Sequence, residues 1–265
     1  AEVIAVLEQA YPSQTAQSWD QVGLVTGDPS QPVRRLHLAL DPTLAVIEEA
    51  RAAGADLLVT HHPLLMRGVN SVAVTSAKGA SVTNLIVGDI ALYVAHTNAD
   101  VAAEGVCVAL AEACGLTDLS PLVVSEEQLL GRVGRLDSPL SLGDFATRVA
   151  SALPAAPVGI RVSGPPDATV ETVAVLGGSG DDLFGAVRAS GADAYITADL
   201  RHHPALEARE EARDGTPYLI DAGHWASEAV WLPRAAKVLR EALGDRVEVV
   251  VSEIVTDPWT FVVHP

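Results

Sequence analysis

The chain has 265 residues, 49% of them hydrophobic and 19% charged, which is enough to build one large or two modest cores. Its 34 acidic and 17 basic residues give a formal net charge of −17, which argues against nonspecific nucleic-acid binding because that needs clustered Lys and Arg. No apolar run approaches the roughly 20 residues that a bilayer demands. We therefore expect a cytoplasmic protein without a membrane span.

Short apolar runs alternate with helical patterns along the chain, which is typical of an α/β protein. The first residues, AEVIAVLEQAYPSQ, form an amphipathic helical pattern and lack the basic segment of a secretion signal. The predicted strands are 34–41, 55–61, 91–96, 172–177, 192–197, 217–223 and 247–254. The main predicted helices are 43–53, 102–114, 142–152, 181–190 and 225–243.

The order of elements suggests an internal repeat. In both halves, a strand and a helix precede the letters G-A-D and a second strand. The letters H-H-P follow that strand, and a further helix leads to a strand that ends near a histidine with a carboxylate four residues later. We predict a first α/β repeat over 1–118, a connecting segment with a Pro- and Gly-rich hinge over 119–170, and a second repeat over 171–265. The last strand could pack back on the first repeat, and convergence on one strand-helix pattern is the alternative to duplication.

Histidines stand at the ends of three predicted strands. His61 and His62 close the strand at 55–61, His96 closes the next one, and His224 follows the strand at 217–223. Ligands gather at the carboxyl ends of strands in open α/β sheets. Adjacent histidines on a regular strand would point to opposite faces, so both members of the first pair can reach one site only if the strand has ended. Pro63 favours such an end.

The spacing of these histidines and nearby carboxylates predicts metal ligands. His96 and Asp100, like His224 and Glu228, are four residues apart, which points both side chains of a pair the same way on a helical turn. Imidazole and carboxylate suit Zn, Mn or Fe. Two such pairs and two more histidines exceed the needs of one ion, so we predict a two-metal site that turns a bridging water into a hydroxide. Each element alone is more often a satisfied polar residue or a surface pair, and only their conjunction favours a site.

Five segments carry a resemblance to a known family. SWDQVGLVTGD, LLVTHHPLL, VAHTNAD, AYITADLRHHPALEA and IDAGHWASE are similar, in this order, to the signature blocks of the Nif-three-like dinuclear metal-centre family, the GTP cyclohydrolase 1 type 2 homologues. The segments run from about Trp19 to Glu228 and cover most of the chain. The resemblance implies a Nif-three-like fold of two intertwined α/β repeats with mixed sheets and flanking helices. It also implies a toroidal homohexamer, and the short linking segment resembles the short form of the family.

The resemblance also implies a set of ligands. It makes His61, His62, Asp100, His224 and Glu228 the ligands of two divalent ions per subunit, with Zn, Fe and Mn left open.

One departure concerns the second H-H-P. Only His203 matches a family histidine, and His202 stands where an aromatic residue is usual, which makes it a rim or surface residue. We assign His203 and His96 to supporting or proton-transfer roles. For His96, a backbone-satisfied histidine near the site is an equally open interpretation.

Two functional hypotheses follow from these residues. The first is a metal-dependent hydrolase that acts on a purine nucleotide such as GTP, with attack at C8 of guanine as the cyclohydrolase version. The reaction rests on family analogy alone. The second is a noncatalytic hexameric scaffold that stores or delivers metal or binds partners. The turn LGGSGDD at 176–182 is a weak phosphate-binding signal, because any tight strand-to-helix turn favours glycine.

Overall fold

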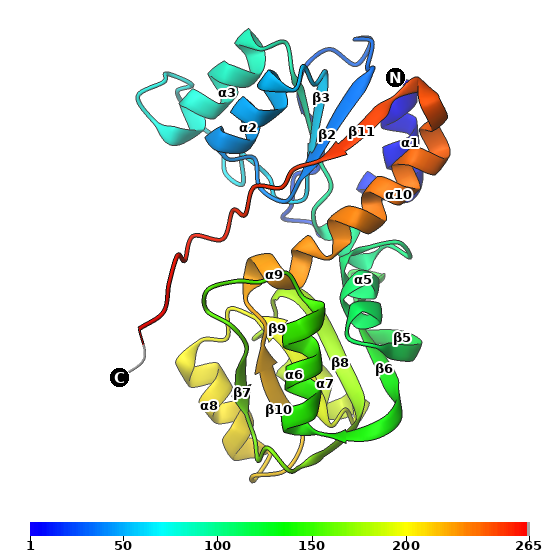
Figure 1. The fold of residues 1–265 in the computed structure, drawn as a ribbon, viewed down its shortest axis with the longest axis vertical. Helices are drawn as coiled ribbons and strands as arrows, with labels where there is room; N and C mark the ends of the chain where they lie inside the picture. The colour runs from blue at the N-terminus through cyan, green and yellow to red at the C-terminus, as the bar shows by residue number, and fades with distance from the viewer. Residues whose placement is uncertain (264–265) are drawn as a thin grey trace. The chain divides into compact units, whose positions relative to one another are not determined.

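The protein is described by a computed structural model that covers residues 1–263. The chain forms two compact units (Figure 1). The first unit contains residues 1–105 and 232–256, and the second contains residues 106–231 and the described residues from 257 onward. The chain therefore leaves the first unit, builds the second one and returns, which gives an α/β protein with one mixed sheet in each unit.

The first unit is built on a five-stranded sheet in the order β1-β4-β3-β2-β11. Strands β2, β3, β4 and β11 are parallel, and β1 runs antiparallel to β4. The strands are β1 (Gly23–Thr26), β2 (Arg35–Ala39), β3 (Leu57–Thr60), β4 (Ala91–Val94) and β11 (Glu248–Val251). The helices are α1 (Glu2–Ala10), α2 (Leu44–Ala52), α3 (Ala77–Val87), α4 (Thr97–Val101) and most of α10 (Trp231–Leu243), with 3-10 turns at Ser13–Thr15 and Gly244–Arg246.

Burial on both faces explains why the central strands of this sheet are continuous apolar runs. Every residue of β3 and β4 is buried, as expected for parallel strands covered on both sides. Leu58 and Leu92 share a core with apolar residues of α2 and α3. Tyr93, the next residue along β4, points to the opposite face, where its hydroxyl donates to Glu8 of α1 at 2.6 Å. The sheet thus has helices on both faces and exposes its strand ends to the loops.

The second unit contains a six-stranded sheet in the order β5-β6-β8-β9-β10-β7. Its centre, β8-β9-β10, is parallel, and the flanking pairs are antiparallel. The strands are β5 (Leu116–Ser125), β6 (Gln128–Ser141), β7 (Arg161–Ser163), β8 (Thr169–Ser179), β9 (Ala194–Ala198) and β10 (Tyr218–Asp221). The helices are α5 (Val106–Ala113), α6 (Leu142–Ala152), α7 (Phe184–Ser190), α8 (His202–Glu211) and α9 (His224–Ala229).

One core joins α5, α6 and α9 to a single face of this sheet. Phe145 of α6 packs in this core with Val173 of β8 and Ile196 of β9. The alternate residues face the other way, where Tyr195 meets Phe184 of α7 with ring centroids 6.1 Å apart. Helix α6 begins where Ser141 accepts a hydrogen bond from the Asp144 backbone amide, the N-cap arrangement that serine favours.

The structure contains all seven predicted strands, and β2-α2-β3-α3-β4 has the same element order as β8-α7-β9-α8-β10. Whether the two are copies of one ancestral unit stays a prediction. Strands β1, β5, β6 and β7 were missed, and the last three build much of the segment that the sequence presents as a connection. Their apolar residues lack the regular alternation that marks a half-buried strand: β5, for instance, has only two buried positions. The predicted helix 225–243 is two helices, α9 and α10.

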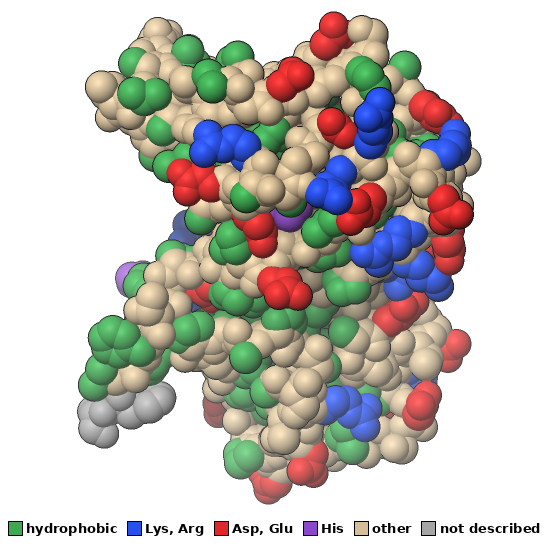
Figure 2. Space-filling view, turned by 45° about the horizontal axis from the view of Figure 1, so that its top comes forward, with side chains coloured by type: hydrophobic (Ala, Val, Ile, Leu, Met, Phe, Trp, Pro, Cys, Tyr) green, Lys and Arg blue, Asp and Glu red, His purple; other side chains and the backbone are tan. Residues whose placement is uncertain are grey.

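The surface carries charges of both signs. Figure 2 shows carboxylate and basic side chains interspersed over the face that it draws. Within residues 1–263, no helix combines the length and apolar character that crossing a bilayer requires.

Candidate metal centre

Three histidines of the first unit gather at the carboxyl ends of β3 and β4. Strand β3 ends at Thr60, so His61 and His62 lie beyond the regular strand, as the sequence predicts. His96 immediately precedes α4. One ring nitrogen from each of the three histidines lies within 4.8 Å of the others. His96 is thus as close to His61 and His62 as a third ligand would be. The sequence instead predicts a supporting or proton-transfer role for it.

One nitrogen of each ring is held by an acceptor. The Nδ1 of His61 lies 2.9 Å from the carbonyl oxygen of Ala95, and the Nδ1 of His62 lies 2.7 Å from a carboxylate oxygen of Asp41. Because carbonyl and carboxylate oxygens only accept, Nδ1 carries the hydrogen in both rings. The tautomer that results has Nε2 as its electron-pair donor, which is the arrangement that carboxylates and carbonyls impose on metal-binding histidines.

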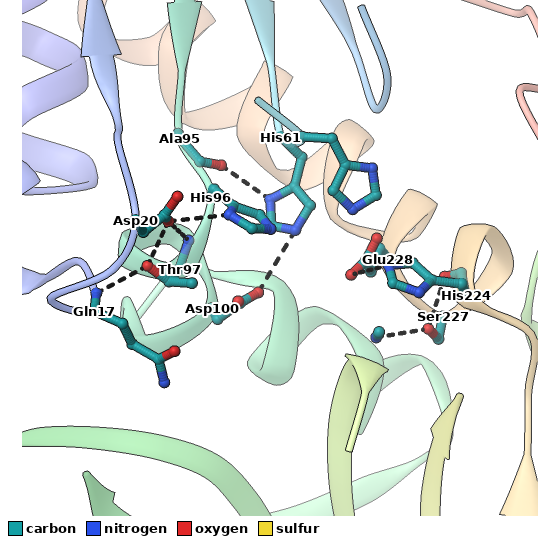
Figure 3. Close-up of polar contacts among 12 residues, drawn as sticks. Gln17, Asp20, His61, Ala95, His96, Thr97, Asp100, His224, Ser227 and Glu228 are labelled. Atoms are coloured by element: carbon teal, nitrogen blue, oxygen red, sulfur yellow. Dashed lines mark hydrogen bonds and ion pairs between the residues drawn. The ribbon is translucent and has the colours of Figure 1, made fainter. Parts of the chain in front are cut away.

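Asp20 organises the third histidine. Its Oδ2 accepts hydrogen bonds from the Nδ1 of His96 at 3.0 Å and from the amide and hydroxyl of Thr97 at 3.1 and 2.6 Å (Figure 3). Burial alone would raise the pKa of Asp20, but these hydrogen bonds and the charge of His96 lower it to about 2. Asp20 is therefore a fixed anion that orients His96 and the first turn of α4.

Asp100 of α4 approaches the same group of histidines. Its Oδ1 lies 3.7 Å from the Nε2 of the buried His61 (Figure 3). This separation exceeds that of a hydrogen bond. Two ligands on a tetrahedral ion with bonds of about 2.1 Å lie about 3.4 Å apart, so the spacing is close to that of two side chains sharing one ion.

The second unit has its own histidine and carboxylate pair on one short helix. His224 and Glu228 are the first and fifth residues of α9, and the Nε2 of His224 lies 3.2 Å from Oε1 of Glu228 (Figure 3). The Nδ1 of His224 lies 2.8 Å from Oδ2 of Asp199. Asp199 directly follows β9 in the left-handed region, at φ 54°. His224 is thus oriented by the same device as His62 and His96.

The glycine turn at the end of β8 makes room for Glu228. Gly178 has φ 70°, and a Cβ on it would lie 2.3 Å from Oε1 of Glu228 and 3.3 Å from Nε2 of His224. Its amide donates to the Ser227 hydroxyl at 3.0 Å, and its carbonyl accepts from the Thr197 hydroxyl at 2.9 Å. Part of the LGGSGDD turn is therefore a cradle for the carboxylate, a role that the sequence did not reveal.

The two H-H-P words do not occupy equivalent positions, which corrects the interpretation of the repeat. His61 stands five residues after Asp56 of the first G-A-D, whereas His202 stands nine after Asp193 of the second. His202 and His203 are exposed in the first turn of α8, with ring centroids 5.1 Å apart. The position directly after β9 is taken by Asp199 instead. The supporting role of His203 stays a prediction.

Sequence reasoning missed the acceptors that hold the rings. Asp41 and Asp199 lie just beyond the ends of β2 and β9, and Asp20 belongs to a quoted family block but received no role. The signal was available, because both strand-end aspartates occupy the edge where ligands collect in parallel sheets. The donor set, imidazole nitrogens and carboxylate oxygens, fits Zn, Fe or Mn.

The cradle can be tested by comparing two glycines with nearly equal backbone angles. In Gly178→Ala the new methyl group collides with Glu228, so we expect Zn²⁺ or Mn²⁺ binding to weaken by about tenfold or more. Gly191 has φ 72° and no atom within 4 Å of a built Cβ. Gly191→Ala should lose about 1 kcal/mol of stability through backbone strain and bind ions normally. Calorimetric titration and urea unfolding measure both quantities, and equal ion affinity in the two variants would contradict the cradle.

The anion at Asp20 predicts a pH-dependent stability. A carboxyl whose pKa falls from 3.8 to about 2 on folding stabilises the protein above pH 4, and the contribution is lost as pH falls toward 2. The difference in unfolding free energy between the protein and its Asp20→Asn variant should therefore shrink by about 2 kcal/mol between pH 5 and pH 2. Denaturant titrations at several pH values measure it, and a constant difference would show that Asp20 is not held as an anion.

Comparisons with known proteins identify the family and the relatives of this chain. The family model described as Duf34/NIF3 (NGG1p interacting factor 3) matches residues 1–258. A Streptomyces coelicolor protein named GTP cyclohydrolase 1 type 2 homolog is 51% identical, with 98% of this chain and 93% of the relative covered. A Mycobacterium bovis protein of the same name is 36% identical, with 98% and 96% covered.

Solved structures give the same result. A Bacillus cereus protein related to NIF3 superposes with a TM-score of 0.90 at 25% identity, with 98% of both chains covered. A hypothetical Staphylococcus aureus protein gives 0.90 at 29% identity, also over 98% of both chains. The match of the family model over almost the whole chain, together with these relatives, places the chain in the Duf34/NIF3 family.

Proposed function

We propose that the protein binds two divalent metal ions and is a metal-dependent hydrolase. The proposed ligands are those expected from the sequence: His61, His62, Asp100, His224 and Glu228. The observation that carries the proposal is the common orientation of the imidazoles. In each of the three, Nδ1 is held by an acceptor, so in the neutral ring Nε2 carries the electron pair that would bind an ion. That all five residues serve one dinuclear centre rests on the family resemblance.

The chemistry divides between the ions and the chain. Bound divalent ions would supply Lewis-acid activation of a water. The chain would hold and move protons: His96, fixed through Nδ1 by Asp20, can carry a proton on Nε2 beside the proposed ligands. We assign His203 a second proton-transfer role, as the family register suggests.

An exposed tryptophan supports a planar substrate such as a purine nucleotide. Trp19 is 54% exposed, and its ring meets His96 edge-on at 5.9 Å. Its indole nitrogen donates to the side-chain oxygen of Gln17 at 2.7 Å, and the backbone amide of Gln17 donates to the Thr97 hydroxyl. A rigid exposed indole beside a proton-transfer group is a stacking platform for a base. The name of the relatives, GTP cyclohydrolase 1 type 2 homolog, points to the same substrate class.

A noncatalytic scaffold is the second candidate, and one observation favours it. An arginine that could meet a triphosphate, Arg201, is engaged within the second unit, where it pairs with Asp181. In this version the protein is a hexamer that stores or delivers metal. We propose the homohexamer and a cytoplasmic location for either function.

Substitution at Glu228 tests the metal centre. Glu228→Gln removes a charged ligand, so we expect the variant to retain fewer divalent ions than the unmodified protein in element analysis and to lose turnover of GTP and of phosphoesters. Glu241→Gln is the matched control, because Glu241 is exposed and pairs only loosely with Lys237, at 3.9 Å. Its ion content and turnover should not change.

The outcomes separate the two candidates. A lower ion content together with a loss of turnover in Glu228→Gln supports the hydrolase. If the metal-loaded protein turns over no member of a broad substrate panel, the scaffold is correct. Unchanged ion content in Glu228→Gln would exclude this residue as a ligand.

The stacking platform has its own test. We expect Trp19→Ala to weaken GTP binding by about tenfold, because base stacking on an aromatic side chain contributes about 1–3 kcal/mol. Trp19→Phe should lose less. Trp259→Ala removes another exposed tryptophan, 64% exposed, and should leave the affinity unchanged. Equilibrium dialysis with radiolabelled GTP measures all three, and equal losses in both alanine variants would remove Trp19 from the substrate site.

A further inference from the structure

The second unit contains a pocket that none of the proposed metal ligands lines. It has a volume of about 350 Å³ and lies between α8, β10 and the edge strand β7. This volume falls within the range of small-molecule sites. Leu200, two residues beyond the end of β9, closes one side.

One face of α8 forms a wall of this pocket. His202, Ala205, Leu206 and Arg209 follow each other at the spacing of a single helical face, and all four line the pocket. A helix that packs fully on a sheet covers such a face with apolar contacts. Here Leu206 remains 48% exposed, and Ala208 is the single buried residue of α8. The helix thus leaves space above the sheet.

The sheet forms the opposite wall. Asp221 and Leu219 of β10 stand directly opposite Arg161 and Ser163 of β7, so these four side chains share one face. Asp221 is buried and accepts hydrogen bonds from the Leu200 amide and from one nitrogen of Arg161. The Arg161 side chain is still 68% exposed, and a guanidinium has five N–H donors. It can therefore bind Asp221 and a ligand together.

Neutral groups hold the second arginine in place. Arg209 donates to the carbonyl oxygens of Gly215 and Pro217, both at 2.7 Å, and lies 5.3 Å from the centre of the Tyr218 ring. These partners orient the guanidinium but carry no negative charge. With two arginines and one aspartate, the pocket has a net charge of +1 in a chain whose formal charge is −17. A cationic pocket on an acidic protein selects anions.

We propose that this pocket is a binding site for a small amphipathic anion, a molecule with a carboxylate or phosphoryl group on an apolar body. Arg161 contacts the anionic group, because arginine pairs well with both kinds of oxyanion. Leu200, Leu206 and Leu219 contact the apolar body. The inference goes beyond the proposed hydrolase, and binding needs no metal.

The test uses the full chain, both metal-free and loaded with Zn²⁺. Phenyl phosphate and benzoate are the anionic probes, benzyl alcohol is the uncharged one, and calorimetry or ligand-observed NMR gives the Kd. We expect at least one anion to bind in both forms of the protein, and to bind at least about tenfold more tightly than benzyl alcohol. The two anions show whether the site prefers a phosphoryl or a carboxylate group.

Three variants locate the binding. Arg161→Gln should weaken binding of the anion by about tenfold. Ala205→Trp should abolish binding by filling the pocket. This second variant keeps the Arg161–Asp221 pair, so it tests the site even if loss of that pair disturbs the fold. Arg188→Gln breaks an exposed ion pair with Glu211 and is the control, with the Kd unchanged. The proposal is overturned if neither anion binds, if benzyl alcohol binds as tightly, or if a folded Ala205→Trp variant keeps the affinity.

Discussion

The hydrogen bond on Nδ1 of each site histidine is the constraint on which the candidate site depends. A free imidazole can carry its hydrogen on either nitrogen and can rotate, whereas an acceptor on Nδ1 fixes both the tautomer and the ring plane. Asp20, Asp41 and Asp199 do this for His96, His62 and His224. For the buried His61 the acceptor is the backbone carbonyl of Ala95. Four rings in two units are thus prepared by one physical device.

Parallel strand ends explain why these acceptors lie where they do. At the end of a parallel strand the chain turns toward a helix, so its side chains are released from the sheet and collect at one edge. In the first unit His61, Asp41 and His96 follow β3, β2 and β4. In the second unit Asp199 and His224 follow β9 and β10. The chemistry of each half therefore follows from its topology.

The positions of the histidines and their acceptors also show which parts of the fold and the site could be predicted from the sequence. The seven predicted strands and the histidines at their ends are local features, and local patterns reveal them. The hydrogen bonds of Asp41 to His62 and Asp199 to His224 join residues 21 and 25 positions apart, which local spacing does not encode. The hairpin of β5 and β6 was not predicted because its apolar residues do not alternate regularly with polar ones: β5 has only two buried positions, and the buried residues of β6 include Arg132. The two H-H-P segments were treated as equivalent because their letters match. The two G-A-D segments fix the register of the strands that follow them, and the histidines lie at different distances from these segments.

The surroundings of His224 and Glu228 in the second unit show why the backbone and the side chains cannot be varied separately. Gly178 and Asp199 both have positive φ, a conformation that costs residues with a Cβ about 1 kcal/mol or more. At position 178 the missing side chain leaves space for Glu228. At position 199 aspartate tolerates the left-handed backbone and supplies the charge that holds His224. Asparagine would satisfy the backbone but offer a neutral acceptor, and glutamate would keep the charge but lose the backbone tolerance. Backbone and side-chain requirements therefore converge on one residue type at each position.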